Sequence, residues 1–219
     1  MDLCDATDMT TCFVLASKSP ARLRMLRSAG IEPVVIASGA DESHLRGEDA
    51  VAMTARLSRL KAHSVIESGA LEEYPADRMI VVACDSVLNL DGRILGKPHT
   101  AERARQWWRR MRGHQGVLVS GHHVAVIVNG QLREQTRIGQ TVVTFADLTD
   151  AEIDAYVDSG EPAAVRGRSL STVWAAPLLL VSTVIPTMSP ASLYHCCARC
   201  SWTSTSNGPH CGTVRRVAI

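Results

Sequence analysis

The chain has 219 residues, 46% of them hydrophobic, so it is long enough to bury a substantial core as one large domain or two small ones. Its 23 basic and 22 acidic residues give a formal net charge of +1, which excludes bulk charge as a basis for binding a nucleic-acid polymer or a membrane surface. No apolar run reaches the roughly 18 residues of a membrane span, and the first residues lack a signal-peptide pattern, so we expect a cytoplasmic protein without a membrane partner.

The seven cysteines are unevenly distributed. Cys4, Cys12 and Cys84 are scattered, as reduced cytosolic thiols are, whereas the other four lie within residues 196–211. This asymmetry indicates that the last quarter of the chain differs from the rest.

The chain opens with a polar segment and a short strand. We expect residues 1–9 to be an N-terminal extension, because Met9 stands where a compact domain would start. Residues 12–16 are apolar and predict the first strand.

A helix is predicted directly after this strand. Ser19 can cap it, Pro20 suits its first position, and Gly30 can end it. Ser17 and Ser19 beside a helix N-terminus predict a phosphate cradle, since free backbone N–H groups and the helix dipole both favour an anion. The alternative is ordinary helix capping, for which Ser-Pro starts are common.

The next predicted unit carries two charged candidates. Residues 33–37 predict a strand, and the apolar spacing of residues 49–68 predicts a helix that ends at Gly69. Glu42 follows the strand and Lys61 lies in the helix. Taken one at a time, these two side chains are expected to be solvated surface charges.

The strongest chemical signal lies in the centre of the chain. Residues 79–84 form the most apolar predicted strand, typical of the centre of a sheet covered on both faces, and Asp85 follows at its end. An Asp91-Gly92 turn then returns the chain to Lys97. A buried carboxylate needs a cationic partner, and a carboxylate with a nearby cation suits metal-dependent phosphate chemistry.

A helix with an aromatic side is predicted after Thr100, which can cap it, and Gly113 ends it. Its predicted buried side consists of Ala104, Trp107, Trp108 and Met111. Stacking of the tryptophans on nucleic-acid bases, beside the basic residues 109–112, is the alternative. We expect packing instead, because the tryptophans have apolar neighbours at helical spacing.

Three further strands are predicted. Asn129-Gly130 is a strong hairpin signal between strands at residues 117–128 and 131–138, and residues 141–145 predict another strand.

The last predicted helix follows these strands. Thr149 and Glu152 can form a capping box at its start, and Gly160 can end it. Local signals and the global pattern agree up to this helix.

Together these segments resemble the Maf family, the nucleoside triphosphate pyrophosphatases also described as septum-formation-inhibitor-like proteins. The family's opening leucine-alanine-serine-x-serine-proline motif with its arginines is matched by residues 15–22, except that Ala21 replaces one arginine. The other matching pieces are Asp41-Glu42, Lys61-Ala62, Asp85, Gly96-Lys97-Pro98, Thr144-Phe145, Tyr156 and Gly160-Glu161-Pro162. The resemblance covers about residues 12–165.

The resemblance implies an α/β fold with a long twisted mixed β-sheet and flanking helices, like that of the inosine triphosphate pyrophosphatases, in a nucleotide-binding domain at residues 10–165. It implies hydrolysis of nucleoside triphosphates to monophosphates and pyrophosphate with Mg²⁺ or Mn²⁺, including removal of non-canonical nucleotides, and a homodimer. The alternative is a non-catalytic nucleotide-binding or cell-division regulator.

The resemblance also implies roles for individual residues. Asp85 and Glu42 would hold the divalent metal, and Asp85 would accept the proton of the attacking water. The residues expected to bind the triphosphate are Ser17, Ser19, Arg22, Lys61 and Lys97. The forked guanidinium of Arg22 suits phosphate better than a lysine would, and the change at Ala21 removes a second such group.

The resemblance ends near Pro162, because residues 166–219 lack the glycine-rich segment and strands with which the family continues. The genetic code allows a test of a shifted reading frame, in which the last base of each codon is read with the first two bases of the next. In this frame the codons of Trp174-Ala175 must encode glycine and those of residues 195–197 must encode leucine-leucine, where the family pattern has these residues. We therefore expect residues 166–219 to be an out-of-frame tail that follows a one-base frameshift near residues 165–167.

Such a tail would leave the last strand of the sheet without its partner, so we expect the tail to be irregular and the chain as written to be poorly stable or inactive. The alternative is a zinc module in the tail, although adjacent cysteines fit the paired knuckles of structural zinc sites poorly. Its candidate ligands are His195, Cys196, Cys197, Cys200, His210 and Cys211.

Overall fold

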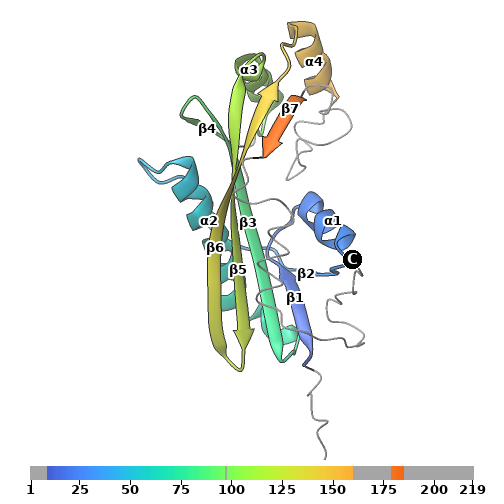
Figure 1. Ribbon diagram of the computed structural model, residues 1–219, viewed down its shortest axis with the longest axis vertical. Helices are drawn as coiled ribbons and strands as arrows, with labels where there is room; N and C mark the ends of the chain where they lie inside the picture. Colours follow the sequence, from blue (N-terminus) through green and yellow to red (C-terminus); the bar gives the residue numbers. More distant parts are fainter. Residues whose placement is uncertain (1–8, 97, 160–178, 185–219) are drawn as a thin grey trace, which may run out of the picture.

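A mixed β-sheet with flanking helices forms the fold, as Figure 1 shows for the computed structural model, which describes residues 9–96, 98–159 and 179–184. The strands are β1 (Thr11–Leu15), β2 (Val34–Val35), β3 (Arg78–Leu90), β4 (Arg93–Leu95), β5 (Gln115–Val128), β6 (Gln131–Phe145) and β7 (Leu179–Val184). The helices are α1 (Pro20–Ser28), α2 (Ala50–Glu67), α3 (Ala101–Met111) and α4 (Asp150–Asp158), with a 3-10 turn η1 (Ala70–Glu73). The predicted α/β class is confirmed.

The sheet combines parallel and antiparallel pairing. Its strand order is β2-β1-β3-β5-β6-β7, with β4 paired to β3 off this path. β1 runs parallel to β2 and β3, whereas the pairs from β3 to β7 are antiparallel. Because β3, β5 and β6 are 13 to 15 residues long, the sheet is much longer than it is wide (Figure 1).

The register of β3 creates a gap along one of its edges. β5 pairs with one edge of β3, whereas β1 pairs with residues 78–82 and β4 with residues 88–90 of the other edge. Within the described part of the chain, residues 83–87 therefore have no strand beside them on that second edge. We call this gap the β3 window.

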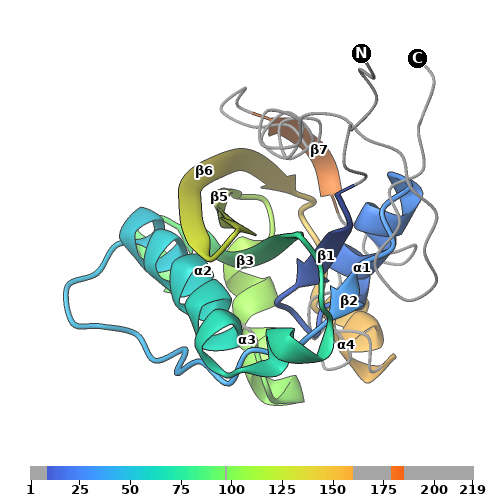
Figure 2. The same cartoon turned by 90° about the horizontal axis from the view of Figure 1, so that it is seen from below.

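Helices cover both faces of the sheet. α2 packs on one face against alternate residues such as Val81 and Ala83, whereas α1 contributes Leu26 to the core on the opposite face (Figure 2). α3 and α4 close one end of the long strands, where Trp108 contacts Phe145 and Tyr156 edge to face (Figure 1).

The capping signals read from the sequence are confirmed. Ser19 caps α1, Thr100 caps α3, and Thr149 forms a full capping box with Glu152 at the start of α4. Asn129 and Gly130 both have positive φ, as a type I′ hairpin turn requires. In α3, Trp108 is buried as predicted, while Trp107 is only half-buried and stacks under the Arg103 guanidinium.

Several predicted boundaries were wrong. β3 continues to Leu90, so Asp85 lies in the middle of a strand and not at its end. The separate strands expected at residues 131–138 and 141–145 are one strand, β6, because its whole length pairs with β5. The expectation that β6 lacks its next partner is also wrong, since Leu179–Val184 pairs with it. The rest of the tail, and Gly160, lie outside the described residues.

Gly121 allows α2 to lie directly on the sheet. It pairs with Asp85 in the ladder, and a Cβ at this position would lie 2.1 Å from the backbone oxygen of Thr54 in α2. Real Cβ atoms do not approach backbone atoms so closely, and the helix backbone cannot yield as a flexible side chain would. The missing side chain at Gly121 therefore sets the height of α2 above Asp85.

Replacing Gly121 with alanine should force α2 away from the sheet. We expect Gly121→Ala to lower the free energy of unfolding by about 2–3 kcal/mol, measured by denaturant titration. Gly39→Ala is the matched control, since a Cβ there meets nothing within 4 Å, and it should change stability by less than about 0.5 kcal/mol. Equal stability of the two variants would contradict this account of helix placement.

Candidate active site

A buried lysine joins two carboxylates beside the β3 window. The Nζ of Lys61 donates a hydrogen bond of 2.6 Å to Oδ1 of Asp85 and lies 3.0 Å from Oε2 of Glu42. Lys61 and Asp85 are 6% and 7% exposed, whereas half of the Glu42 side chain is exposed. The expectation that Lys61 is a surface charge was wrong, because the residue lies on the buried side of α2 and pairs with Asp85 in the sheet. The prediction that Glu42 is an exposed side chain is confirmed.

This buried ion pair is costly to maintain. Removing two charges from water offsets most of their attraction, so a buried pair contributes little stability compared with apolar packing. Breaking it by removing one partner typically costs about 3–5 kcal/mol, since the other charge stays buried. Charged groups held at such cost beside an open strand edge are typical of functional sites.

Arg56 fixes the loop that carries Glu42. Its guanidinium contacts both carboxylate oxygens of Glu48, at 2.6 and 2.7 Å, and donates a 3.0 Å bond to the backbone oxygen of Ser43. Hydrogen bonding to Arg56 lowers the pKa of the Glu48 carboxyl, so this pair stays charged at neutral pH. Arg56 was not predicted from the sequence, although its position on α2 five residues before Lys61 is visible there.

A second group of side chains gathers around Arg22. One terminal nitrogen of its guanidinium donates to Oγ of Ser17 (3.2 Å), and the other donates to Oγ of Ser86 (3.4 Å). The Ser19 hydroxyl caps α1, as the alternative of ordinary helix capping predicted. The backbone N–H of Ser19 donates to Oγ of Ser17. Ser86 in turn lies 2.8 Å from the hydroxyl of Ser120.

The two groups meet at the β3 window. Asp85 and Ser86 are consecutive in β3, so their side chains point to opposite faces of the sheet, one toward α2 and one toward α1. The structure thus brings together six of the seven predicted site residues; Lys97, the seventh, lies outside the described residues. Ser86 and Ser120 were not predicted, since a serine beside Asp85 has no distinctive spacing.

Asp85 and Glu42 offer a donor set that suits a hard divalent cation. One oxygen of each carboxylate already contacts the same cationic atom, Nζ of Lys61, so the two side chains can reach a common cation. Mg²⁺ in nucleotide enzymes is typically held by one or two carboxylates, with phosphate oxygens and water completing its shell.

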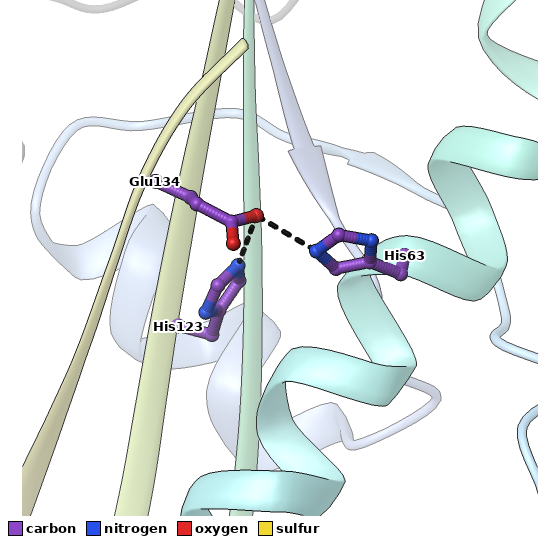
Figure 3. Close-up of side chains that lie close together, drawn as sticks. All are labelled: His63, His123 and Glu134. Atoms are coloured by element: carbon purple, nitrogen blue, oxygen red, sulfur yellow. Dashed lines mark hydrogen bonds and ion pairs between the residues drawn. The ribbon is translucent and has the colours of Figure 1, made fainter.

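The described residues contain one cluster of three side chains that could hold a metal ion, and it lies elsewhere. Ligand atoms of His63, His123 and Glu134 lie within 4.8 Å of one another (Figure 3). Sequence reasoning missed this cluster, because its members come from α2, β5 and β6 and share no local motif.

These features define a class of protein. A buried strand with an acid at a gap in the sheet, two cationic side chains and a serine-rich helix start have the chemistry that suits a phosphorylated anion accompanied by a divalent cation. The Maf family model, described as Maf-like protein, matches residues 12–170 of this chain. The chain therefore belongs to the Maf family.

Three relatives are named nucleoside triphosphate pyrophosphatase. The protein of Cutibacterium acnes (strain DSM 16379 / KPA171202) is 99% identical over 159 residues, which cover 73% of this chain and 75% of that protein. Those of Salinispora tropica and Gloeothece citriformis are 45% and 42% identical over 154 and 159 residues, which cover 70% and 73% of this chain and 66% and 76% of the relatives. None of the described helices is long and apolar enough to span a membrane.

His122 should make the protein less stable in mild acid. Burial, and then the charge of Arg22, lowers its pKa from 6.5 to about 4. Below pH 6.5 the unfolded chain binds a proton at His122, whereas the folded protein binds it only near pH 4. The stability that neutral His122 contributes is therefore complete above pH 6.5 and is lost as the pH falls toward 4. The loss should be at most about 3 kcal/mol, measured by denaturant titration across this range.

The variant His122→Gln should flatten this pH dependence. His114→Gln is the control, because His114 is exposed and its ring bonds to the backbone oxygen of Arg112. An unchanged slope in the His122 variant would show that another group is responsible.

Proposed function

We propose that this chain is built to hydrolyse nucleoside triphosphates to nucleoside monophosphates and pyrophosphate. The observation that carries the proposal is the convergence of Lys61, Asp85 and Glu42 with the Arg22–Ser86 group at the β3 window. The names of the relatives support the same reaction. We further propose a cytoplasmic location, and, on the family resemblance alone, a homodimer.

The charges of the site suit the reaction. A triphosphate gains negative charge on its oxygens as the bond between the α-phosphate and the pyrophosphate breaks, and Lys61 and Arg22 can counter that charge from the two faces of β3. Ser17 and Ser86 hold the Arg22 guanidinium at both ends, so it needs little reorganisation to bind phosphate. Lys97 is proposed to contribute a further cation.

Asp85 is placed to accept the proton of the attacking water. Oδ1 of Asp85 accepts the hydrogen bond from Lys61, and we propose that the other oxygen, Oδ2, takes the proton of the water. A Mg²⁺ or Mn²⁺ ion held by Asp85 and Glu42 would polarise the phosphate oxygens and lower the pKa of a bound water. The proton taken up by Asp85 is released to solvent after pyrophosphate leaves.

We propose that residues 166–219 are an out-of-frame tail. Near-identity to the Cutibacterium acnes protein over 159 residues, with about a quarter of each chain outside the match, is what a late frameshift produces. The strand Leu179–Val184 pairs with β6 even so, and backbone pairing of this kind depends little on side-chain identity.

Removing the charge of Asp85 should abolish turnover. In a frame-restored chain, Asp85→Asn should lower the rate of pyrophosphate release by about 10²–10⁴-fold, because the proton acceptor is lost. Asp91→Asn is the matched control: Asp91 is an exposed turn residue with positive φ, which asparagine tolerates, so its rate should be unchanged. Near-normal turnover in the Asp85 variant, at unchanged nucleotide binding, would remove Asp85 from the mechanism.

Restoring the frame should separate an enzyme from a non-catalytic binder. Insertion of one base near codons 165–167 should raise both the melting temperature and the rate of pyrophosphate release, assayed over a panel of canonical and modified nucleotides. If the restored chain binds nucleotide without releasing pyrophosphate, the regulator hypothesis is correct. If the chain as written is as stable and as active as the restored one, the frameshift proposal fails.

A further inference from the structure

Two histidines and a glutamate converge between α2 and the sheet, away from the acid–lysine group. His63 comes from α2, His123 from β5 and Glu134 from β6, and Figure 3 shows their side chains pointing toward one another. Oε2 of Glu134 lies 2.7 Å from Nε2 of His63 and 3.5 Å from Nε2 of His123. One carboxylate oxygen thus faces two imidazole nitrogens.

His123 is buried, and its Nε2 faces the Glu134 carboxylate at 3.5 Å without forming a hydrogen bond. The residue is 1% exposed, and its Nε2 is a buried atom without a hydrogen-bond partner in the described structure. Its other nitrogen, Nδ1, lies 2.8 Å from Oγ1 of Thr136. If Nδ1 carries the hydrogen and donates it to Thr136, the lone pair of Nε2 points at the centre of the cluster.

His63 has a matching arrangement and is open to solvent. Its Nδ1 lies 3.5 Å from Oε1 of Glu67, one helical turn further along α2, while its Nε2 faces Glu134. Carboxylate and hydroxyl partners on the outer nitrogens of histidines are the usual support of metal ligands. His63 also lines a groove of about 660 Å³ formed mainly by residues of α2, so this ligand can be reached from solvent.

We propose that His63, His123 and Glu134 bind a divalent transition-metal ion, with Zn²⁺ as the best match. Two imidazole nitrogens and one carboxylate oxygen form a donor set that zinc accepts with a fourth position open. Tetrahedral zinc with bonds of about 2.0–2.1 Å separates its ligand atoms by about 3.3 Å. Glu134 Oε2 lies 2.7 and 3.5 Å from the two nitrogens, and all three ligand atoms lie within 4.8 Å of one another, so the side chains would close on the ion by shifts of about 1 Å.

This site differs from the one proposed for the reaction. Nitrogen ligands disfavour Mg²⁺, which binds oxygen, so the two sites select different ions. An ion here would link α2 to β5 and β6, two residues along α2 from Lys61. Its loss should therefore loosen the helix that carries the cation of the acid–lysine group.

Metal titration of the purified full-length chain, freed of any histidine tag and of bound metal, tests the proposal. Zn²⁺ should bind at one ion per chain at this site and raise the melting temperature, and Co²⁺ should give ligand-field absorption without thiolate charge-transfer bands. Glu134→Gln and His63→Ala should each weaken Zn²⁺ binding at least tenfold. Both positions are partly exposed, so folding of the variants can be confirmed by circular dichroism without metal.

A subtler variant separates metal binding from packing. Thr136→Val removes the hydroxyl beside Nδ1 of His123 and should weaken Zn²⁺ binding by about 10–100-fold. His114→Ala, which removes an exposed histidine elsewhere, should leave the affinity unchanged.

The tail cysteines provide the decisive comparison. A chain with Cys196, Cys197, Cys200 and Cys211 replaced by serine should keep the zinc that His63→Ala loses. Zinc that disappears with the cysteines and survives in the Glu134 and His63 variants, or the absence of any zinc-dependent rise in melting temperature, would overturn the proposal.

Discussion

The contact between Lys61 and Asp85 is the interaction on which the rest of the site depends. A lysine on a helix can reach the middle of a buried strand only if the helix lies almost against the sheet, and Gly121 provides that space in the strand next to Asp85. Lys61 and Asp85 compensate each other where water is excluded, and Glu42 supplies Lys61 with a second carboxylate from a loop held by Arg56. The distance of α2 from the sheet, the loop held by Arg56 and the length of β3 are therefore all needed to form this one ion pair.

The site uses both faces of a single strand. Consecutive residues of a strand point in opposite directions, so Asp85 and Ser86 collect partners from α2 and from α1 without any long excursion of the chain. A single ligand can contact groups on both faces only where no neighbouring strand covers the edge of β3. The separation between β1 and β4 leaves that edge uncovered. Parallel pairing on one side of β3 and antiparallel pairing on the other are thus part of how the site is built.

Local signals predicted much of this structure. Ser19, Thr100 and Thr149 cap helices where expected, and the candidate acids and cations were found because each lies in a recognisable motif. Tertiary context explains what was missed: β3 runs past Asp85 because β5 pairs with its whole length, and Lys61 is buried because a glycine sixty residues away admits its helix. The cluster of His63, His123 and Glu134 depends on the register of β5 and β6, which no local pattern shows.

The β3 window also bears on how a bound molecule would be recognised. The backbone oxygen of Val82 accepts a bond from Ala16, so it points to the edge shared with β1, and main-chain groups alternate sides along a strand. The peptide groups of Cys84 and Ser86 consequently face into the opening. Main-chain N–H and C=O groups do not depend on the side chain, so hydrogen bonds from them to a bound molecule would persist through most amino-acid substitutions. Evolution could then vary the surrounding side chains to change which base is accepted while that backbone anchor persists.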